Sequence, residues 1–144
     1  MALSIDVSLP IDAPPAAVWA CLSDTGSWPR WSDVLVALDG DREVGARQRL
    51  RLRMAGGLPL IATVELTVWT PGVGIEWVGG LPLGLFRARH GFRIEPSQAG
   101  ATITHYEHFS GLLPWLLGPL LRRLEVRHRR VNEQIRAEVE RRAA

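Results

Sequence analysis

Two histidines and one glutamate form the most chemically capable grouping in this 144-residue sequence. His90 lies in one segment of alternating apolar and polar residues, and His105 and Glu107 lie in the next. Such alternation is typical of half-buried strands, and all three residues share the apolar parity of their segments. In neighbouring strands, Cβ atoms that face each other are about 4.5–5.5 Å apart. The spacing therefore predicts a His/His/Glu cluster on one face of a sheet.

Such a cluster supports several roles. A histidine held by a carboxylate can bind a ligand carbonyl or enol, or move a proton during an aldol-type cyclisation. The same groups can instead pair with one another or with the backbone, because buried polar groups need partners. Two histidines and a carboxylate also ligate iron or zinc in other proteins. No supporting motif accompanies them here, so neither a metal ion nor a cofactor is expected.

The flanking residues predict the elements that must hold this cluster. Residues 3–11 alternate as a strand, and Asp12 is a candidate N-cap for a short helix that starts at the following prolines. Residues 28–31 form a second helical turn. Strand patterns separated by glycine and proline turns then fill residues 33–109. The order predicts an antiparallel meander with one wet and one dry face.

The C-terminal segment changes period. From Leu117 to Val139, apolar residues recur every three or four positions, which is typical of a long amphipathic helix. Gly118 and Pro119 predict a kink or restart in its first turns. Together these elements predict an α+β helix-grip fold: a curved seven-stranded antiparallel sheet wrapped around a long C-terminal helix, with two short helices after the first strand.

Several stretches of the sequence also resemble a known superfamily. Residues 11–19 (IDAPPAAVW) and 28–31 (WPRW) resemble the opening of the SRPBCC superfamily, which groups START, polyketide cyclase/dehydrase and birch-pollen-allergen domains. Residues 90–96 (HGFRIEP), residues 104–111 (THYEHFSG) and the leucine-rich helix look like its polyketide cyclase/lipid-transport branch. The likeness spans residues 1–144 as a single domain.

This resemblance implies a ligand cavity between the sheet and the C-terminal helix. The expected ligand is a hydrophobic small molecule such as a lipid, an isoprenoid or an aromatic polyketide. The alternative is a polyketide cyclase or dehydratase that uses His90, His105 and Glu107 for acid/base chemistry. Fold alone does not decide between a carrier and an enzyme. The expected ligand-contacting residues are Trp31, Met54, Trp77, Phe86, His90, Phe92, His105, Glu107, Leu117 and Leu121.

The run Leu112–Leu121 has three interpretations: a gate at the cavity mouth, a contact with a membrane surface, or ordinary packing of the helix entry. The uncharged run containing it, residues 108–121, is shorter than the roughly 18 apolar residues that a membrane span needs, so no stable membrane insertion is expected. No secretory signal is visible, and the expected location is cytoplasmic. The single cysteine, Cys21, excludes an internal disulfide. The sequence does not distinguish a monomer from a homodimer.

The basic residues comprise 17 arginines and no lysine, against 15 acidic residues. This surplus of two charges gives a sequence pI near 9.4. The arginines of residues 47–53 and 87–93 fall on the wet face of the sheet, where Glu65 and Glu76 can pair with them. Aromatic residues do not alternate with them as a platform for single-stranded nucleic acid requires. We therefore expect a solvated face and no nucleic-acid partner.

Overall fold

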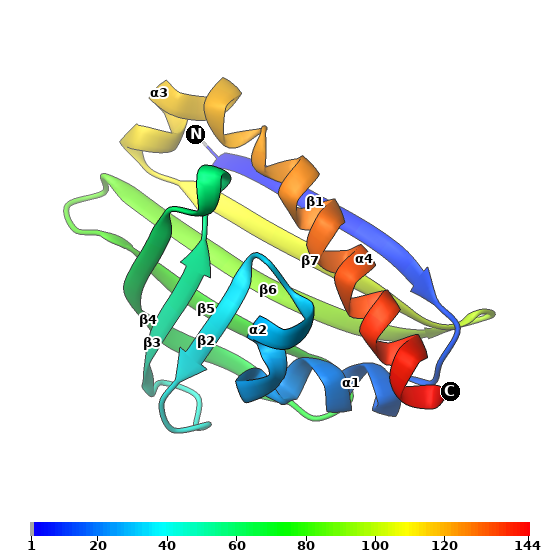
Figure 1. The fold of residues 1–144 in the computed structure, drawn as a ribbon. Helices are drawn as coiled ribbons and strands as arrows, with labels where there is room; N and C mark the ends of the chain where they lie inside the picture. The colour runs from blue at the N-terminus through cyan, green and yellow to red at the C-terminus, as the bar shows by residue number, and fades with distance from the viewer. Residues whose placement is uncertain (1) are drawn as a thin grey trace.

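A single antiparallel sheet of seven strands forms the framework of residues 2–144, the part of the chain that the computed structural model describes. The predicted helix-grip fold is confirmed, and β1 lies beside β7 because the last strand of the meander returns to the first (Figure 1). The spatial order is β1-β7-β6-β5-β4-β3-β2. The strands are β1 (Ala2–Ile11), β2 (Leu35–Asp39), β3 (Arg47–Arg53), β4 (Pro59–Thr70), β5 (Gly74–Leu81), β6 (Phe86–Ser97) and β7 (Gly100–Ser110).

Two short helices, α1 (Pro15–Ser23) and α2 (Trp28–Trp31), follow the first strand as predicted. The predicted N-cap was wrong, because Pro14 rather than Asp12 occupies that position and no side chain caps the helix. Pro14 precedes another proline, which excludes the helical conformation and holds its ψ at 158°. The two prolines thus delay the helix start to Pro15.

The C-terminal helix is divided into α3 (Leu112–Leu121) and α4 (Leu124–Ala143), as its glycine and proline predicted. Arg122 and Arg123 between them keep helical backbone angles, so the chain kinks rather than unwinds. α4 runs along the concave face of the sheet, and α3 lies at the end of it that is farther from α1 (Figure 1). No helix within residues 2–144 has the length and apolar character needed to cross a membrane.

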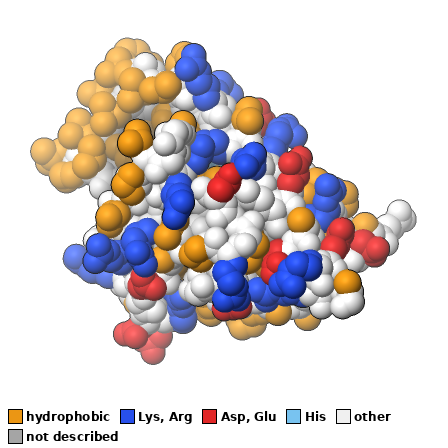
Figure 2. Space-filling view, viewed as in Figure 1, with side chains coloured by type: hydrophobic (Ala, Val, Ile, Leu, Met, Phe, Trp, Pro, Cys, Tyr) orange, Lys and Arg blue, Asp and Glu red, His pale blue; other side chains and the backbone are white. Residues whose placement is uncertain are grey.

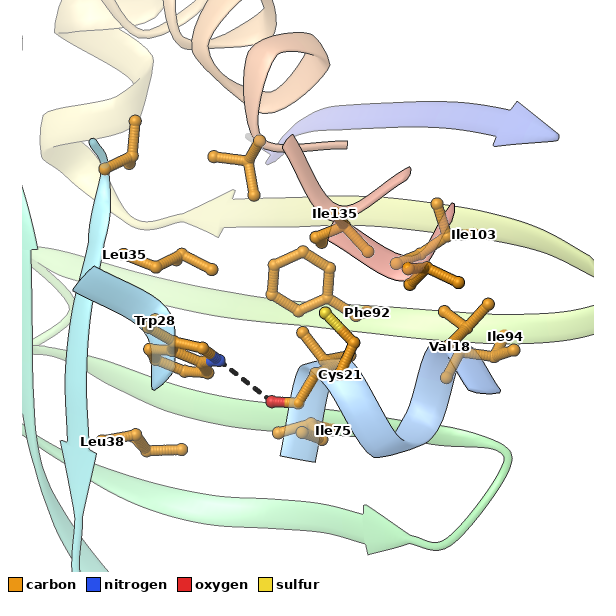
Figure 3. Close-up of a cluster of buried hydrophobic side chains, with 14 of the residues drawn as sticks. Val18, Cys21, Trp28, Leu35, Leu38, Ile75, Phe92, Ile94, Ile103 and Ile135 are labelled. Atoms are coloured by element: carbon orange, nitrogen blue, oxygen red, sulfur yellow. Dashed lines mark hydrogen bonds between the residues drawn. The ribbon is translucent and has the colours of Figure 1, made fainter. Parts of the chain in front are cut away.

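The hydrophobic core fills the space between the sheet, α1, α2 and the C-terminal half of α4 (Figure 3). Trp28 is fully buried at its centre, and its indole N–H donates a hydrogen bond to the Leu22 carbonyl oxygen at 3.0 Å. Cys21 lies in the same core, where burial raises the pKa of its thiol to about 12. This cysteine is therefore an apolar core residue, since a reactive thiolate requires a lowered pKa.

The outer face of the sheet carries the arginines, as predicted, and β3 alternates exposed arginines with buried inward residues. The predicted pairing of Glu76 with an arginine is confirmed, because Arg89 Nη1 lies 3.2 Å from its Oε1, but its expected exposure was wrong, because its carboxylate is buried in a polar network on this face. It accepts hydrogen bonds from the Tyr106 hydroxyl at 2.7 Å and the Thr67 hydroxyl at 2.6 Å. Tyr106 reaches Glu76 by crossing Gly91 of β6, where a Cβ atom would lie 2.4 Å from the tyrosine oxygen.

Candidate functional site

A cavity of about 550 Å³ lies between the sheet and the junction of α3 and α4. Inward residues of β3 to β7 line it from the sheet side, and Leu121 and Leu124 line it from the helices. Among its lining residues only His90 and Glu107 direct polar side chains into it, because Thr63 is paired with the outward Arg49 and its side chain lies on the outer face of the sheet. The cavity is thus an apolar chamber with one polar region.

His90 and Glu107 form the titratable part of the cavity wall. They are directly paired across β6 and β7, which places both side chains on the concave face. His90 Nδ1 lies 3.9 Å from Glu107 Oε2, and both side chains are largely buried. The strand register that the alternation predicted therefore brings the two groups together inside the cavity.

His105 lies next to His90 but behind the cavity wall, where it lines a small adjoining recess. The Nε2 atoms of the two rings are 2.5 Å apart, the ring centroids are 4.8 Å apart, and the ring planes differ by 9°. This centroid separation is nearly the largest that such a nitrogen contact permits. The rings therefore lie edge to edge in nearly one plane and share a single N–H···N hydrogen bond.

The backbone fixes the direction of that hydrogen bond. His105 Nδ1 lies 3.4 Å from the carbonyl oxygen of His128, which can only accept. A neutral His105 thus donates from Nδ1 and accepts at Nε2, so His90 donates from Nε2. The remaining nitrogen of His90, Nδ1, carries the lone pair that faces Glu107. A proton added at this atom would sit between the ring and the carboxylate, at the cavity wall.

A third histidine, His128 of α4, completes the cluster. Its ring stacks face to face on His105, with centroids 4.0 Å apart and planes 8° apart. His128 Nε2 is 3.1 Å from Glu107 Oε1, but it is a buried nitrogen without a well-aligned hydrogen bond. The two atoms are therefore in contact without an aligned hydrogen bond, and the carboxylate lies between His90 and His128.

Burial and charge act in opposite directions on these groups. Burial lowers the pKa of His90 to about 4 and that of His105 well below its ordinary value, against the weaker opposing effect of Glu107 on His90. Burial alone would raise the pKa of Glu107, but the charge of His90 and the contacts of His128 outweigh it and leave that pKa below its usual value. At neutral pH the imidazoles of His90 and His105 are thus neutral and lie beside one carboxylate.

The nitrogens of His90, His105 and His128 lie within 4.8 Å of one another, so we tested whether they suit a metal ion. A metal lies in the plane of each imidazole that binds it, about 2.0–2.1 Å from nitrogen for zinc. The Nε2 atoms of His90 and His105 instead point at each other across 2.5 Å and share one proton, and His128 is stacked above His105 in a separate plane. The donor set does not converge on one point and is arranged for proton sharing.

The structure places the ten predicted ligand-contacting residues in three settings. Six line the cavity: Met54, Trp77, Phe86, His90, Glu107 and Leu121. His105 lies behind them, and Phe92 packs against its ring in the core at a centroid distance of 4.2 Å. Trp31 donates its indole N–H to the Ser27 hydroxyl beside α2, and Leu117 lies exposed on α3. A role for any of them in ligand binding stays a prediction.

His128 is the member of the cluster that the sequence analysis did not include. It stands on the apolar stripe of the C-terminal helix, where it is the one ionisable side chain among leucines, valines and isoleucine. That exception to the pattern was the available signal. The alternation in the strands could not predict that His128 joins the cluster, because it does not determine which turn of the helix faces His90 and His105.

Comparisons with solved structures show the same fold along the whole chain. The aromatase/cyclase Zhui from Streptomyces sp. R1128 matches with a TM-score of 0.78 and 15% identity over 100% of this chain and 97% of that one. The protein Ara h 8.0201 matches with a TM-score of 0.67 and 11% identity over 96% and 98% of the two chains. At these identities the likeness concerns the fold alone.

The chain also resembles part of larger proteins. The di-domain aromatase/cyclase StfQ of the steffimycin biosynthetic pathway matches with a TM-score of 0.75 and 18% identity over 99% of this chain. The chain spans about half of such proteins, 52% of StfQ and 50% of the di-domain BexL. No curated protein sequence matches it. The family model described as polyketide cyclase/dehydrase and lipid transport matches residues 2–140, and the chain therefore belongs to that family, the branch of the SRPBCC superfamily that its sequence resembles.

Proposed function

We propose that the protein binds an uncharged, largely apolar small molecule that carries a hydroxyl or enol group. The observation that carries this proposal is the cavity of about 550 Å³, whose polar side chains are confined to His90 and Glu107. Its volume falls within the usual range of about 300–1,000 Å³ for small-molecule sites. The flat side chains of Trp77 and Phe86 in its wall suit an aromatic or polycyclic ligand.

The polar region selects the kind of functional group. Glu107 is a carboxylate at neutral pH and accepts hydrogen bonds, while no arginine lines the cavity. A ligand carboxylate or phosphate placed there would meet a like charge without a counter-ion, which is costly in a buried site. A phenol or enol would instead donate to Glu107. Among the expected ligand classes, these features favour a hydroxylated aromatic polyketide over a fatty acid or a phospholipid headgroup.

A matched pair of probes tests this selection. We expect 2-naphthol to bind, measured by fluorescence titration, at least about tenfold more tightly than 2-naphthoate, because only the carboxylate repels Glu107. Glu107→Gln should narrow the difference. Ala88→Trp, at the cavity wall, should abolish binding of both, whereas Ala137→Trp on the exposed face of α4 should leave binding unchanged. Equal or tighter binding of 2-naphthoate would contradict the proposal.

A cyclase or dehydratase activity is the second candidate, and one observation favours it. His90 lies at the cavity wall with a lone pair beside Glu107 and an N–H shared with His105, so it can take up a ligand proton and return it. The fold likeness to aromatase/cyclases agrees with this role. His90→Phe should abolish turnover of a model poly-β-ketone while the variant still binds 2-naphthol. An unchanged rate would exclude this candidate and leave the binding function.

A further inference from the structure

We propose that the end of the molecule around the cavity mouth docks on the surface of an anionic lipid bilayer. The surface concerned, here called the mouth surface, consists of residues 55–61, residues 80–86 and α3. This proposal goes beyond the proposed ligand binding, because docking on a bilayer requires only the exposed side chains of these segments and no ligand in the cavity.

Large apolar side chains are exposed throughout the mouth surface. Leu83 at the tip of the β5–β6 hairpin is 93% exposed, Leu58 is 67% exposed and Trp115 is 59% exposed. The remaining members are Leu60, Ile61, Leu81, Leu112, Leu116, Leu117 and Leu120. Figure 2 shows the resulting concentration of hydrophobic side chains over α3. An exposed apolar cluster of this kind marks an interaction site on a soluble domain.

The three segments surround one opening. The backbone N–H groups of Leu112 and Leu113 donate to the carbonyl oxygens of Gly84 and Leu85, at 3.0 and 2.8 Å, which joins α3 to the hairpin. Leu60, Leu81 and Leu121 each line the cavity, and the first two are also exposed. The apolar interior of the cavity is therefore continuous with the apolar mouth surface.

The segments that form the mouth surface and their neighbours in the chain carry charges of one sign, and Glu65 of β4 lies at their border beside Arg87. Residues 50–62, 79–90 and 109–124 contain no aspartate or glutamate, while Arg53, Arg87, Arg122 and Arg123 are exposed among them. Within residues 2–144, none of these four guanidinium groups makes a salt bridge, although the chain forms several elsewhere. Unpaired arginines that border exposed leucines and a tryptophan match the headgroup region of an anionic bilayer.

This charge pattern selects the bilayer over a second copy of the chain. A two-fold interface would bring the same patch on both copies together, so the unpaired arginines of one copy would face a patch that carries the same unpaired arginines. A bilayer instead offers negative charge at its surface and an apolar layer directly beneath it. Trp115 suits the boundary between the two, where tryptophan is enriched. Docked in this way, the cavity would open toward a medium that dissolves its apolar ligands.

Vesicle flotation tests the proposal with the ligand-free protein. We expect the protein to float with vesicles of phosphatidylcholine and phosphatidylglycerol, to bind pure phosphatidylcholine vesicles at least about tenfold more weakly, and to be released by high salt. Binding to neither composition, or equal binding to both, would contradict the proposal. So would a dimer in light scattering that Leu116→Ser abolishes while the protein stays off vesicles, since a second copy would then cover the surface.

Matched variants separate the two parts of the surface. The double variant R122E/R123E should weaken binding to the anionic vesicles roughly 30-fold or more, because each arginine contributes through the surface potential. Trp115→Ala should weaken binding to a smaller extent and leave its salt dependence intact. As a charge-matched control, R47E/R49E alters two exposed arginines of β3 outside the mouth surface. Thermal melts establish that each variant is folded. An equal loss in the control would show a non-specific charge effect and overturn the assignment.

Discussion

The concave face of the sheet is filled with packed side chains at one end and is hollow at the other. At one end, α1, α2 and the C-terminal half of α4 fill the concave face with a close-packed core that includes Trp28 and Ile135 (Figure 3). At the other end, α3 and the start of α4 leave a cavity of about 550 Å³ over the same strands. The strands extend through both ends. The position of the helices above them therefore determines where the interior is close-packed and where it is hollow.

The histidine cluster lies at the boundary between these regions. His105 contacts the core residue Phe92 on one side and His90 on the other, and His90 reaches the cavity. A packed interior holds side chains in fixed positions, whereas a cavity admits a ligand. The boundary combines both properties, because it presents a chemically capable group to a ligand while the core fixes its orientation. Variants in the filled end, the boundary and the hollow end should therefore behave differently.

The largest effect is expected in the filled end. Trp28→Ala should lower the free energy of unfolding by about 3–5 kcal/mol, because it leaves a cavity in a close-packed core. It also leaves the Leu22 carbonyl without its hydrogen bond. Urea denaturation followed by circular dichroism measures the change. A loss below about 1 kcal/mol would show that this end is as loosely filled as the other.

The boundary should make stability depend on pH. The folded pKa of His90 is about 4 against an ordinary value of 6.5, so between these values the unfolded chain binds a proton that the native ring does not. Stability should therefore fall as the pH is lowered from 6.5 to 4, by about 3 kcal/mol from His90 alone. The lowered pKa of His105 adds to the fall in the same direction.

Urea midpoints across this pH range check the prediction, and H90Q/H105Q should flatten the profile. His108 offers a control, since it lies partly exposed on the outer face beside Asp6. His108→Gln should retain most of the dependence seen in the original protein. A profile that stays steep in H90Q/H105Q would place the responsible groups outside the boundary.

The hollow end should tolerate truncation. Phe86→Ala removes a large side chain, but one that already borders empty space and is only half-buried. The expected loss is about 1 kcal/mol, well below the usual 3–5 kcal/mol for a core phenylalanine, because little new cavity is created. The same variant should weaken binding of 2-naphthol. Measuring both quantities on one preparation distinguishes the two ends, and a loss as large as that of Trp28→Ala would remove the distinction.

The smallest effect is expected at the surface of the filled end, where Asp33 meets Arg130 and Gln134 of α4. Hydrogen bonds from Arg130 and Gln134 lower the pKa of Asp33 to about 2. Both charged side chains are more than half exposed, so Asp33→Ala should cost less than about 1 kcal/mol. Differential scanning calorimetry at low and high salt checks this value. A larger, salt-independent loss would assign the pair to the packed core.

The sequence predicted the strands well because their information is local. Alternation alone placed His90, His105 and Glu107 on the concave face, and the register confirms this placement. The position of His128 depends on how α4 is rotated against the sheet, which no local pattern determines. The burial of Glu76 likewise depends on Tyr106 crossing a glycine of the strand between them. Contacts that join three elements could thus not be predicted from the patterns of the separate segments.

The contact of Tyr106 with Glu76 across Gly91 has a consequence for how the sheet assembles. β5, β6 and β7 carry a polar network on each face, and the two networks are separated only by the backbone. A shift of β6 by one residue would turn His90 outward and place a side chain where Tyr106 needs empty space. Misaligned pairing of these three strands would therefore leave buried polar groups without hydrogen-bond partners on both faces of the sheet. The hydrogen bonds on the outer face thus fix the strand register that places the histidines on the inner face. The geometry of the cavity wall therefore depends on contacts on the opposite side of the sheet.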